Sequence, residues 1–326
     1  MESRDKFKGC MVGLAVGDAL GMPCEDYSYS AIIKYFGRVT DFLNPDKENH
    51  PNYRLKAGMY TDDTEQAIVL AESLIENNGL DVNHFANKLL GEYGRNVVEH
   101  PELDRWIGST FKKAVKNHIS GLPSDKCGVK AKSCGSAMRV APIGLVYWSD
   151  LINVAENAAK SSRVTHIGAE TTAAAEAVAL YVTLAARGKY SPQEMSEIVT
   201  QMTEKESKII AKRIKKAYEL KDKKPEKALD ILGDSELARE TIPSAIYSFN
   251  HSPYDFENAV LTSVNLGGDT DSRAAITGAI SGAFKGLYGI PFGWVKRLEN
   301  KEKLIQLGDK LYTASSKQSQ IRLQSR

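Results

Sequence analysis

The sequence predicts an all-α protein, a compact domain of many crossing helices, and two observations support this. Apolar residues recur every three or four positions, the period of a helix with one buried face, over residues 67–75, 171–186, 207–220 and 274–284. Alternating Val/Ile/Thr runs bounded by turn residues, which are typical of strands, are nearly absent. The segment 171–184 is rich in alanine, the best helix former, and its small side chains favour close helix packing.

Composition excludes several classes of protein. The 326 residues are 42% hydrophobic and 26% charged, near the globular average, which argues against a disordered or fibrous chain. Forty-three Lys and Arg balance 41 Asp and Glu, so stable nucleic-acid binding is not expected. No composition shift divides the chain, and we expect one domain over residues 1–314 followed by a polar tail at 315–326.

The cellular setting follows from the cysteines and the apolar runs. Four cysteines without a C-x-x-C spacing exclude a disulfide scaffold and a zinc ribbon. The charged start lacks the apolar core of a signal peptide, and the most apolar run, 177–186, is far below the ~20 residues of a membrane span. We expect a cytoplasmic monomer without a membrane partner.

The first motif with chemical potential covers residues 58–65, just before a helical pattern. Thr61 can cap the helix, and Asp62 and Asp63 favour the positive end of its dipole. The same turn presents two adjacent carboxylates and hydroxyls, which are ligands for hard cations. Both interpretations, a helix cap and a metal site, stay open for this motif alone.

The second motif covers residues 265–272 and also leads into a helical pattern. Gly267 and Gly268 permit a tight turn, and Asp269 and Asp271 can then direct two carboxylates to one place, with Ser272 adding a hydroxyl. An EF-hand is excluded, because the required glycine and closing glutamate are missing. A glycosyltransferase D-x-D motif would follow a strand, which the helical pattern disfavours.

If the two motifs meet, four carboxylates share one pocket. Such crowding would force protons onto them, whereas two divalent cations would balance their charge. Oxygen ligands without His or Cys at ligand spacing favour Mg²⁺ or Mn²⁺ over zinc. A pair of such ions can orient a water and a substrate for hydrolysis.

Residues 9–25 form a third motif. Gly9, Gly13, Gly17 and Gly21 fall on one face of a helix, where they predict a close helix crossing. Asp18 and Glu25 are acids in an apolar stretch and therefore require partners. Glu25 follows Pro23, where the helix is expected to end and a loop could bring its carboxylate into a pocket.

The fourth motif is the small, hydroxylated segment of Ser133, Cys134, Gly135 and Ser136, which could present backbone N–H groups to a phosphate. Arg139, close behind it, could anchor a carboxylate or a loop carbonyl. Cys134 has no evident base beside it and is a poor nucleophile. His166, before the alanine-rich helix, could cap, pack or contact substrate.

The chain carries these motifs in the same order as the ADP-ribosylglycohydrolases, which it resembles. That family includes dinitrogenase reductase-activating glycohydrolase and the ADP-ribosylarginine hydrolases. The matching residues are 9–25, 58–64, 136–142, Thr165-His166, 266–272 and the ending Pro291-x-x-Trp294. The resemblance covers nearly the whole chain. It implies a compact all-α domain with two Mg²⁺ or Mn²⁺ ions held between its helices.

The resemblance also implies roles for single residues. The implied metal ligands are Thr61, Asp62, Asp63, Asp269, Asp271 and Ser272. Glu25 corresponds to the acid beside the metals and is the first choice of base, with Asp62 and Asp269 also implied in catalysis. Residues 133–136 correspond to the diphosphate-contacting loop, with His166 as a further substrate contact. Serine stands at 272 where the family usually has threonine, and Cys134 often replaces an asparagine.

The implied reaction is hydrolysis of the bond between ADP-ribose and an acceptor on a protein or another molecule, with arginine as the first candidate. We expect residues 47–55 and 99–125 to select the acceptor. Two rival functions use a similar architecture: a non-catalytic ADP-ribose binder or crystallin-like structural protein, and a two-metal nucleotide phosphoesterase. The first should have lost metal ligands, whereas the four aspartates are present here. The second usually has histidine ligands as well.

Overall fold

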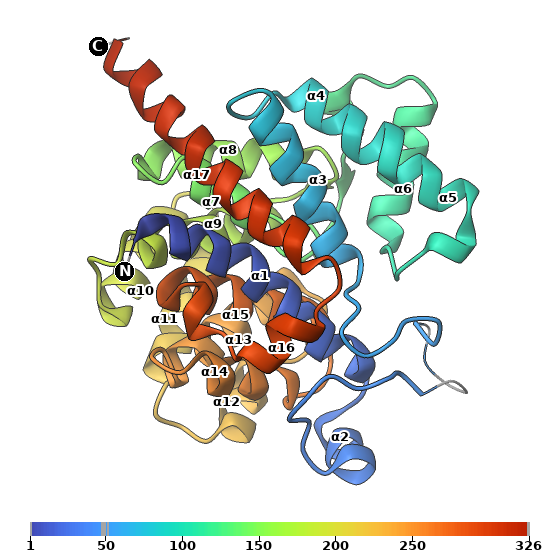
Figure 1. Ribbon diagram of the computed structural model, residues 1–326, viewed down its shortest axis with the longest axis vertical. Coiled ribbons are helices and arrows are strands. Elements are labelled where there is room, and N and C mark those ends of the chain that lie inside the picture. Colours follow the sequence, from blue (N-terminus) through green and yellow to red (C-terminus); the bar gives the residue numbers. More distant parts are fainter. Residues whose placement is uncertain (1, 47–49, 51, 325–326) are drawn as a thin grey trace.

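The computed structural model describes residues 2–46, 50 and 52–324. Helices dominate it, and all four segments with helical periodicity lie in helices, so the predicted all-α class is confirmed (Figure 1). The α-helices are α1 (Ser3–Gly21), α2 (Tyr29–Phe36), α3 (Asp62–Glu76), α4 (Val82–Ala86), α5 (Arg95–Glu99), α6 (Ser109–Ile119), α7 (Ala141–Val146), α8 (Leu151–Arg163), α9 (Ala169–Arg187), α10 (Pro192–Thr203), α11 (Lys208–Glu219), α12 (Pro225–Leu232), α13 (Ala238–His251), α14 (Phe256–Val264), α15 (Thr270–Lys285), α16 (Phe292–Arg297) and α17 (Lys301–Gln324).

Short elements complete the chain. A π-helical segment, Asn87–Gly94, joins α4 to α5, and a 3₁₀ turn, Met22–Cys24, ends α1. The strands of the described part are β1 (Val129–Lys130) and β2 (His166–Ile167), which pair in parallel with Val129 opposite His166. This pairing ties the segment before α7 to the segment before α9.

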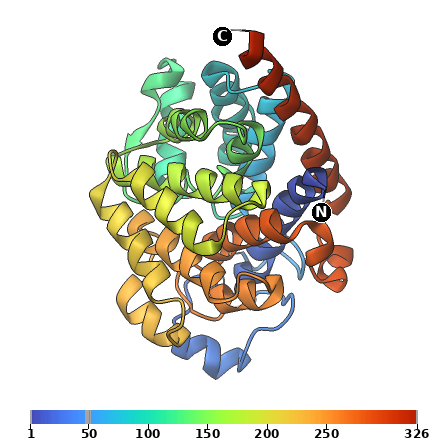
Figure 2. The ribbon, with the colours of Figure 1, turned by 90° about the vertical axis from the view of Figure 1, so that its left-hand side faces the viewer.

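Helix α1 is a central packing element: its residues 9–21 are all buried, and it packs along α15, with α17 on another side (Figures 1 and 2). The predicted glycine stripe makes this crossing close. A Cβ on Gly9, Gly13 or Gly17 would overlap backbone atoms of α15. Two helices that are more than 240 residues apart in the sequence therefore touch through their main chains.

Helix α9 is the second central element. Every residue from 171 to 186 is buried, because small alanine side chains let α9 pack against α8 and α15 at the same time. The four cysteines are free and buried, as expected for a chain without a disulfide framework. None of the helices in the described residues is long and apolar enough to cross a bilayer.

Helix α17 extends past the predicted domain end at residue 314. It continues to Gln324, so the backbone of the expected polar tail is helical over most of its length. The last two residues lie outside the described part of the chain. The break that polar composition suggested at 315 is therefore not a break in helical structure.

Candidate metal centre

The two aspartate motifs line one cavity in the structure. Asp62 and Asp63 start α3, whereas Asp269 and Asp271 flank the start of α15, and all four contribute to the cavity wall. Glu25, from the turn after α1, lines the same cavity. Carboxylates from three distant stretches of the chain therefore share one space, so the two motifs, whose meeting the sequence left open, do meet in the structure.

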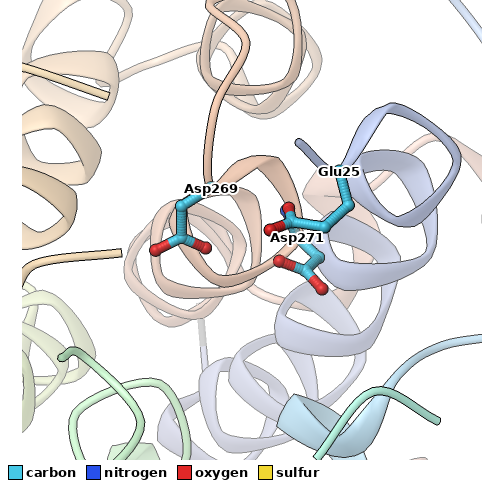
Figure 3. Close-up of side chains that lie close together, drawn as sticks. All are labelled: Glu25, Asp269 and Asp271. Atoms are coloured by element: carbon cyan, nitrogen blue, oxygen red, sulfur yellow. The ribbon is translucent and has the colours of Figure 1, made fainter. Parts of the chain in front are cut away.

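Three of these carboxylates are especially close together. One oxygen each from Glu25, Asp269 and Asp271 lies within 4.8 Å of the others (Figure 3). All three side chains are buried. Burial, with Asp271 and Asp269 nearby, raises the pKa of Glu25 well above its usual value, and burial together with Asp269 raises the pKa of Asp271 to about 8. A cation would relieve this repulsion.

Asp62 and Asp63, at the start of α3, are also buried close to other carboxylates. Burial and then the charge of Asp271 raise the pKa of Asp62 and of Asp63 well above the usual value. Among the described residues, Asp63 Oδ1 is buried without a hydrogen-bond partner. An orphaned buried carboxylate oxygen is costly, and a metal ion is one of the groups that can satisfy it. The residues present therefore fit a divalent cation with oxygen ligands.

Asp18 holds the first turn of α3. Its Oδ1 accepts hydrogen bonds from the Thr61 N–H and hydroxyl, both at 2.9 Å, and its Oδ2 accepts from the Thr64 N–H at 3.0 Å and hydroxyl at 2.6 Å. Both oxygens are thus engaged with the protein. Sequence reasoning indicated that Asp18 needs a partner but assigned it no place in the site.

Glu25 does for α15 what Asp18 does for α3. Its Oε2 accepts from the Thr270 N–H at 2.8 Å and from the Asp271 N–H at 3.4 Å. The N-terminus of α15 carries a partial positive charge that favours this carboxylate. Two acids at the end of the central helix therefore orient the two turns that carry the aspartates.

The two predicted hydroxyl ligands differ in placement. Ser272 lines the cavity, with its Oγ 3.7 Å from the sulfur of Met138. Thr61 is fully buried, does not line the cavity and donates its hydroxyl to Asp18. Thr61 also caps α3 by accepting from the Asp63 N–H at 3.4 Å, so the helix-cap interpretation of this motif holds as well.

The predicted phosphate loop is only partly at the cavity. Ser133, Cys134 and Gly135 line it, whereas Ser136 is buried behind it, where its hydroxyl accepts from Ser162 at 2.8 Å. The Cys134 N–H donates to the carbonyl of Glu236 at 2.9 Å and is therefore committed within the protein. The loop thus offers fewer groups to a ligand than its sequence suggested.

Cys134 contacts one of the clustered carboxylates directly. Its Sγ lies 3.2 Å from Asp269 Oδ2, which also accepts from the Thr241 hydroxyl at 2.6 Å. Burial and the charge of Asp269 raise the pKa of the thiol well above its usual value. Cys134 is therefore a protonated donor that orients Asp269, in line with its prediction as a poor nucleophile.

Arg139 is buried and joins both sides of the cavity. One nitrogen donates to Gln66 Oε1 at 2.5 Å and to the carbonyl of Gly135 at 3.3 Å, so the predicted loop anchor is confirmed. Gln66 Nε2 in turn donates to Asp62 Oδ2 at 2.6 Å. The guanidinium thereby fixes the amide of Gln66, which then presents its donor to Asp62.

The second nitrogen of Arg139 acts, through Thr165, on the tautomer and charge of His166. It donates to the Thr165 hydroxyl at 2.6 Å, and this hydroxyl lies 2.7 Å from His166 Nδ1. Thr165 accepts from Arg139 and can give its own proton to Nδ1, and in that tautomer Nε2 carries the ring proton and is a donor. Burial and Arg139 lower the pKa of His166 to about 3, so the ring is neutral. His166 lines the cavity beside Gly135, and its role as a substrate contact stays a prediction.

One wall of the cavity lies within residues 99–125, which the sequence analysis assigned to acceptor selection without singling out any residue. Its members from the segment before α6 and from the start of that helix are Trp106, Gly108, Ser109, Thr110 and Phe111. Gln66 and Glu236 also line the cavity. Gln66 lies one turn after Asp62 on the same helix, a spacing that could have revealed it. The sequence offers no comparable signal for Glu236.

Comparison with known proteins agrees with this geometry. The ADP-ribosylglycohydrolase family profile matches residues 1–321. ADP-ribosylarginine hydrolase Tri1 of Serratia proteamaculans is 29% identical, covering 95% of this chain and 80% of that protein. ADP-ribosylhydrolase ARH3 of Bos taurus is 29% identical, covering 97% of this chain and 94% of that protein. A solved structure of an ADP-ribosylglycohydrolase-related protein complex superposes with a TM-score of 0.76 at 28% identity, covering 96% of this chain and 99% of that one.

The family profile spans almost the whole chain, and the aligned relatives are similar in sequence over nearly all of it. The helical architecture and the acidic cavity between helices are the features that the resemblance implied. The protein is therefore a glycosidase that belongs to the ADP-ribosylglycohydrolase family.

Proposed function

We propose that this protein is a metal-dependent hydrolase that releases ADP-ribose from an ADP-ribosylated protein side chain, with arginine as the acceptor. The observation that carries the proposal is the cavity itself. Five buried carboxylates from three segments converge there, and an oxygen of Asp63 is left without a partner in the described structure. Such a site suits a divalent cation and a polyhydroxylated, anionic substrate.

The proposed metal ligands are the four aspartates Asp62, Asp63, Asp269 and Asp271, with Ser272 at the cavity wall. Thr61 is the least supported of the ligands implied by the family, because its hydroxyl is donated to Asp18. When bound, two Mg²⁺ or Mn²⁺ ions would supply Lewis acidity toward ribose hydroxyls and a water at neutral pH.

Glu25 is the proposed general base. One of its oxygens is held by the N-terminus of α15, so the carboxylate has a fixed orientation toward Asp269 and Asp271. A carboxylate oriented in this way can take a proton from an attacking water. Asp62 and Asp269 complete the negative lining, which favours the positive charge that develops at the anomeric carbon.

The opposite side of the cavity is proposed to hold the diphosphate. His166 directs a neutral Nε2–H donor there, and Gly135 leaves room beside it, since a Cβ at this position would lie 2.9 Å from Nε2. A neutral donor fixed by Thr165 and Arg139 keeps its proton throughout the physiological pH range. The same property argues against a phosphoesterase, which usually uses histidine nitrogen as a metal ligand.

Names of relatives support the arginine acceptor without deciding it. The Serratia proteamaculans relative is named for ADP-ribosylarginine, whereas the ARH3 name specifies no acceptor. The decisive experiment offers ADP-ribosylated arginine, serine and nucleic-acid substrates with Mg²⁺, with Mn²⁺ and with EDTA. We expect metal-dependent release of free ADP-ribose from the arginine substrate. The proposal is wrong if no substrate yields ADP-ribose with either metal.

Two substitutions tie the reaction to this cavity. Asp62→Asn and Asp269→Asn should each reduce kcat by at least about 100-fold, because each removes a charged oxygen ligand. Glu72→Gln is the matched control, since Glu72 lies on α3 but on the outer side, where it pairs with Lys303 at 2.9 Å. Circular dichroism should show that all three variants keep their helical content.

A further inference from the structure

A second cavity lies next to the metal centre. It is lined by residues 52–55 and Met59, by Glu65 of α3, by Tyr93 of the π-helical segment, by Asn96 and Val97 of α5, and by residues 101–106. Both segments expected to select the acceptor, 47–55 and 99–125, thus contribute to it, although residues 47–49 and 51 lie outside the described part. Trp106 lines this cavity and the metal cavity at once.

The backbone of Trp106 is held in an unusual conformation. Its φ is 79°, in the left-handed region that large side chains rarely occupy. Asp104 Oδ1 stabilises this turn by accepting from the N–H groups of Trp106, at 2.9 Å, and Ile107, at 2.8 Å. Strained residues of this kind persist where the surrounding structure imposes them, frequently at ligand sites.

The residue before Trp106 locks the turn to the metal centre. The Arg105 carbonyl accepts from the Asp62 N–H at 3.3 Å. The Arg105 guanidinium is bound by Glu299 at 2.7 and 3.0 Å and by Glu65 at 3.2 Å. The indole next to it is 44% exposed, so a rigid frame presents an accessible aromatic surface beside a proposed metal ligand.

The charge around Trp106 favours a cation. Among the described residues that line the metal cavity, none is Lys or Arg. Six carry carboxylates: Glu25, Asp62, Asp63, Glu236, Asp269 and Asp271. The second cavity is lined by two arginines, Arg54 and Arg105, and by three carboxylates, those of Glu65, Glu102 and Asp104. Arg105 is neutralised by Glu65 and Glu299, which leaves Arg54 against the remaining acids. A cation that enters here meets negative potential and an aromatic face.

We propose that Trp106 is one wall of an acceptor subsite, and that a planar cationic group, the guanidinium of an arginine acceptor, stacks on its indole. This inference rests on the proposed function, because it identifies where the leaving group of that reaction binds. The ADP-ribose part occupies the metal cavity on one side of the indole, and the acceptor extends into the second cavity on the other.

The test separates acceptor binding from ADP-ribose binding. Trp106→Ala should raise KM for ADP-ribosylarginine about tenfold, the loss expected for one cation–aromatic contact. Its affinity for free ADP-ribose, measured by calorimetry with Mg²⁺, should stay within twofold of wild type. Trp106→Phe should recover most of the loss because it keeps an aromatic face. Tyr288→Ala is the control, an exposed aromatic residue outside both cavities.

A second measurement does not depend on turnover. Trp106 is the most exposed of the three tryptophans, so arginine methyl ester should quench the fluorescence of wild type but not of Trp106→Phe. An unchanged KM in Trp106→Ala, or equal quenching in both proteins, overturns the inference. Activity on serine-linked ADP-ribose alone would overturn the guanidinium subsite but leave the hydrolase. Absence of all hydrolysis with normal quenching would overturn the proposed function but leave the subsite.

Discussion

Asp18 shows how much one buried side chain can determine. Its four hydrogen bonds from Thr61 and Thr64 hold the turn that presents Asp62 and Asp63. We expect Asp18→Ala to lower the free energy of unfolding by about 2–4 kcal/mol, because four buried donors lose their acceptor. Urea denaturation with EDTA would measure this loss.

The same substitution should weaken Mn²⁺ binding at least tenfold in calorimetry, since the turn that carries the ligands loses its anchor. Asp18→Asn keeps one acceptor oxygen and is the graded comparison. Its Mn²⁺ affinity should lie between those of wild type and Asp18→Ala. A folded Asp18→Ala protein with wild-type Mn²⁺ affinity would show that the turn orients its aspartates without this residue.

Single residues were predictable where their chemistry is local. Asp62 and Asp63 are adjacent in the sequence, and Asp269 and Asp271 are separated by one residue. The sequence alone therefore marks each pair as a cluster of carboxylates. The partner of Asp18 lies 43 residues away and depends on how α1 and α3 pack. Ser136 lies behind the cavity wall because side-chain direction in an irregular loop follows tertiary contacts, which a sequence motif does not reveal.

At the scale of elements, the α1–α15 crossing is the contact that positions the site. We expect Gly17→Ala to destabilise the protein by more than about 3 kcal/mol, because the new methyl group overlaps the backbone at Ala274. Gly293→Ala is the matched control: no atom lies within 4 Å of its added Cβ, and the site is in α16. Its stability should equal or slightly exceed that of wild type. Equal Tm values for Gly17→Ala and Gly293→Ala would show that α1 and α15 can move apart to accept the methyl group without loss of stability.

Helix content followed readily from the sequence, because long amphipathic or alanine-rich segments have few alternative structures. The extent of α17 beyond residue 314 did not, since a polar composition is equally compatible with an exposed helix. Residues 99–125 were expected to select the acceptor, but which of them line the acidic cavity could not be predicted. The position of this segment depends on the long-range bonds of Arg105 to Glu65 and Glu299.

For the whole molecule, we expect the carboxylate cluster to make the thermal stability depend on whether a metal ion is bound. Metal-free Asp271→Asn should be more stable than metal-free wild type, raising Tm by about 2–6 °C at pH 8.5, because one repelling charge is removed. With Mn²⁺ the order should reverse, since the variant has lost a ligand and gains less from binding. Calorimetric scans with EDTA and with Mn²⁺ measure both differences.

The pH dependence has a defined sign. Folding raises the pKa of Asp271 from 3.8 to about 8, so its contribution to stability is full below about pH 4, falls progressively between pH 4 and pH 8, and stays lost above pH 8. The advantage of the metal-free variant should therefore be largest above pH 8 and disappear near pH 4. Equal stability of the two metal-free proteins at pH 8.5 would contradict the role of repulsion.

The central pairing of α1 with α15 has a consequence for biosynthesis. Asp269 and Asp271 are synthesised about 245 residues after Glu25, so the cavity cannot form until that whole stretch has been made. Until then the glycine face of α1 has no partner. A nascent or truncated chain that ends before residue 269 would therefore present an unpaired helix to chaperones and would lack two of the buried carboxylates of the cavity.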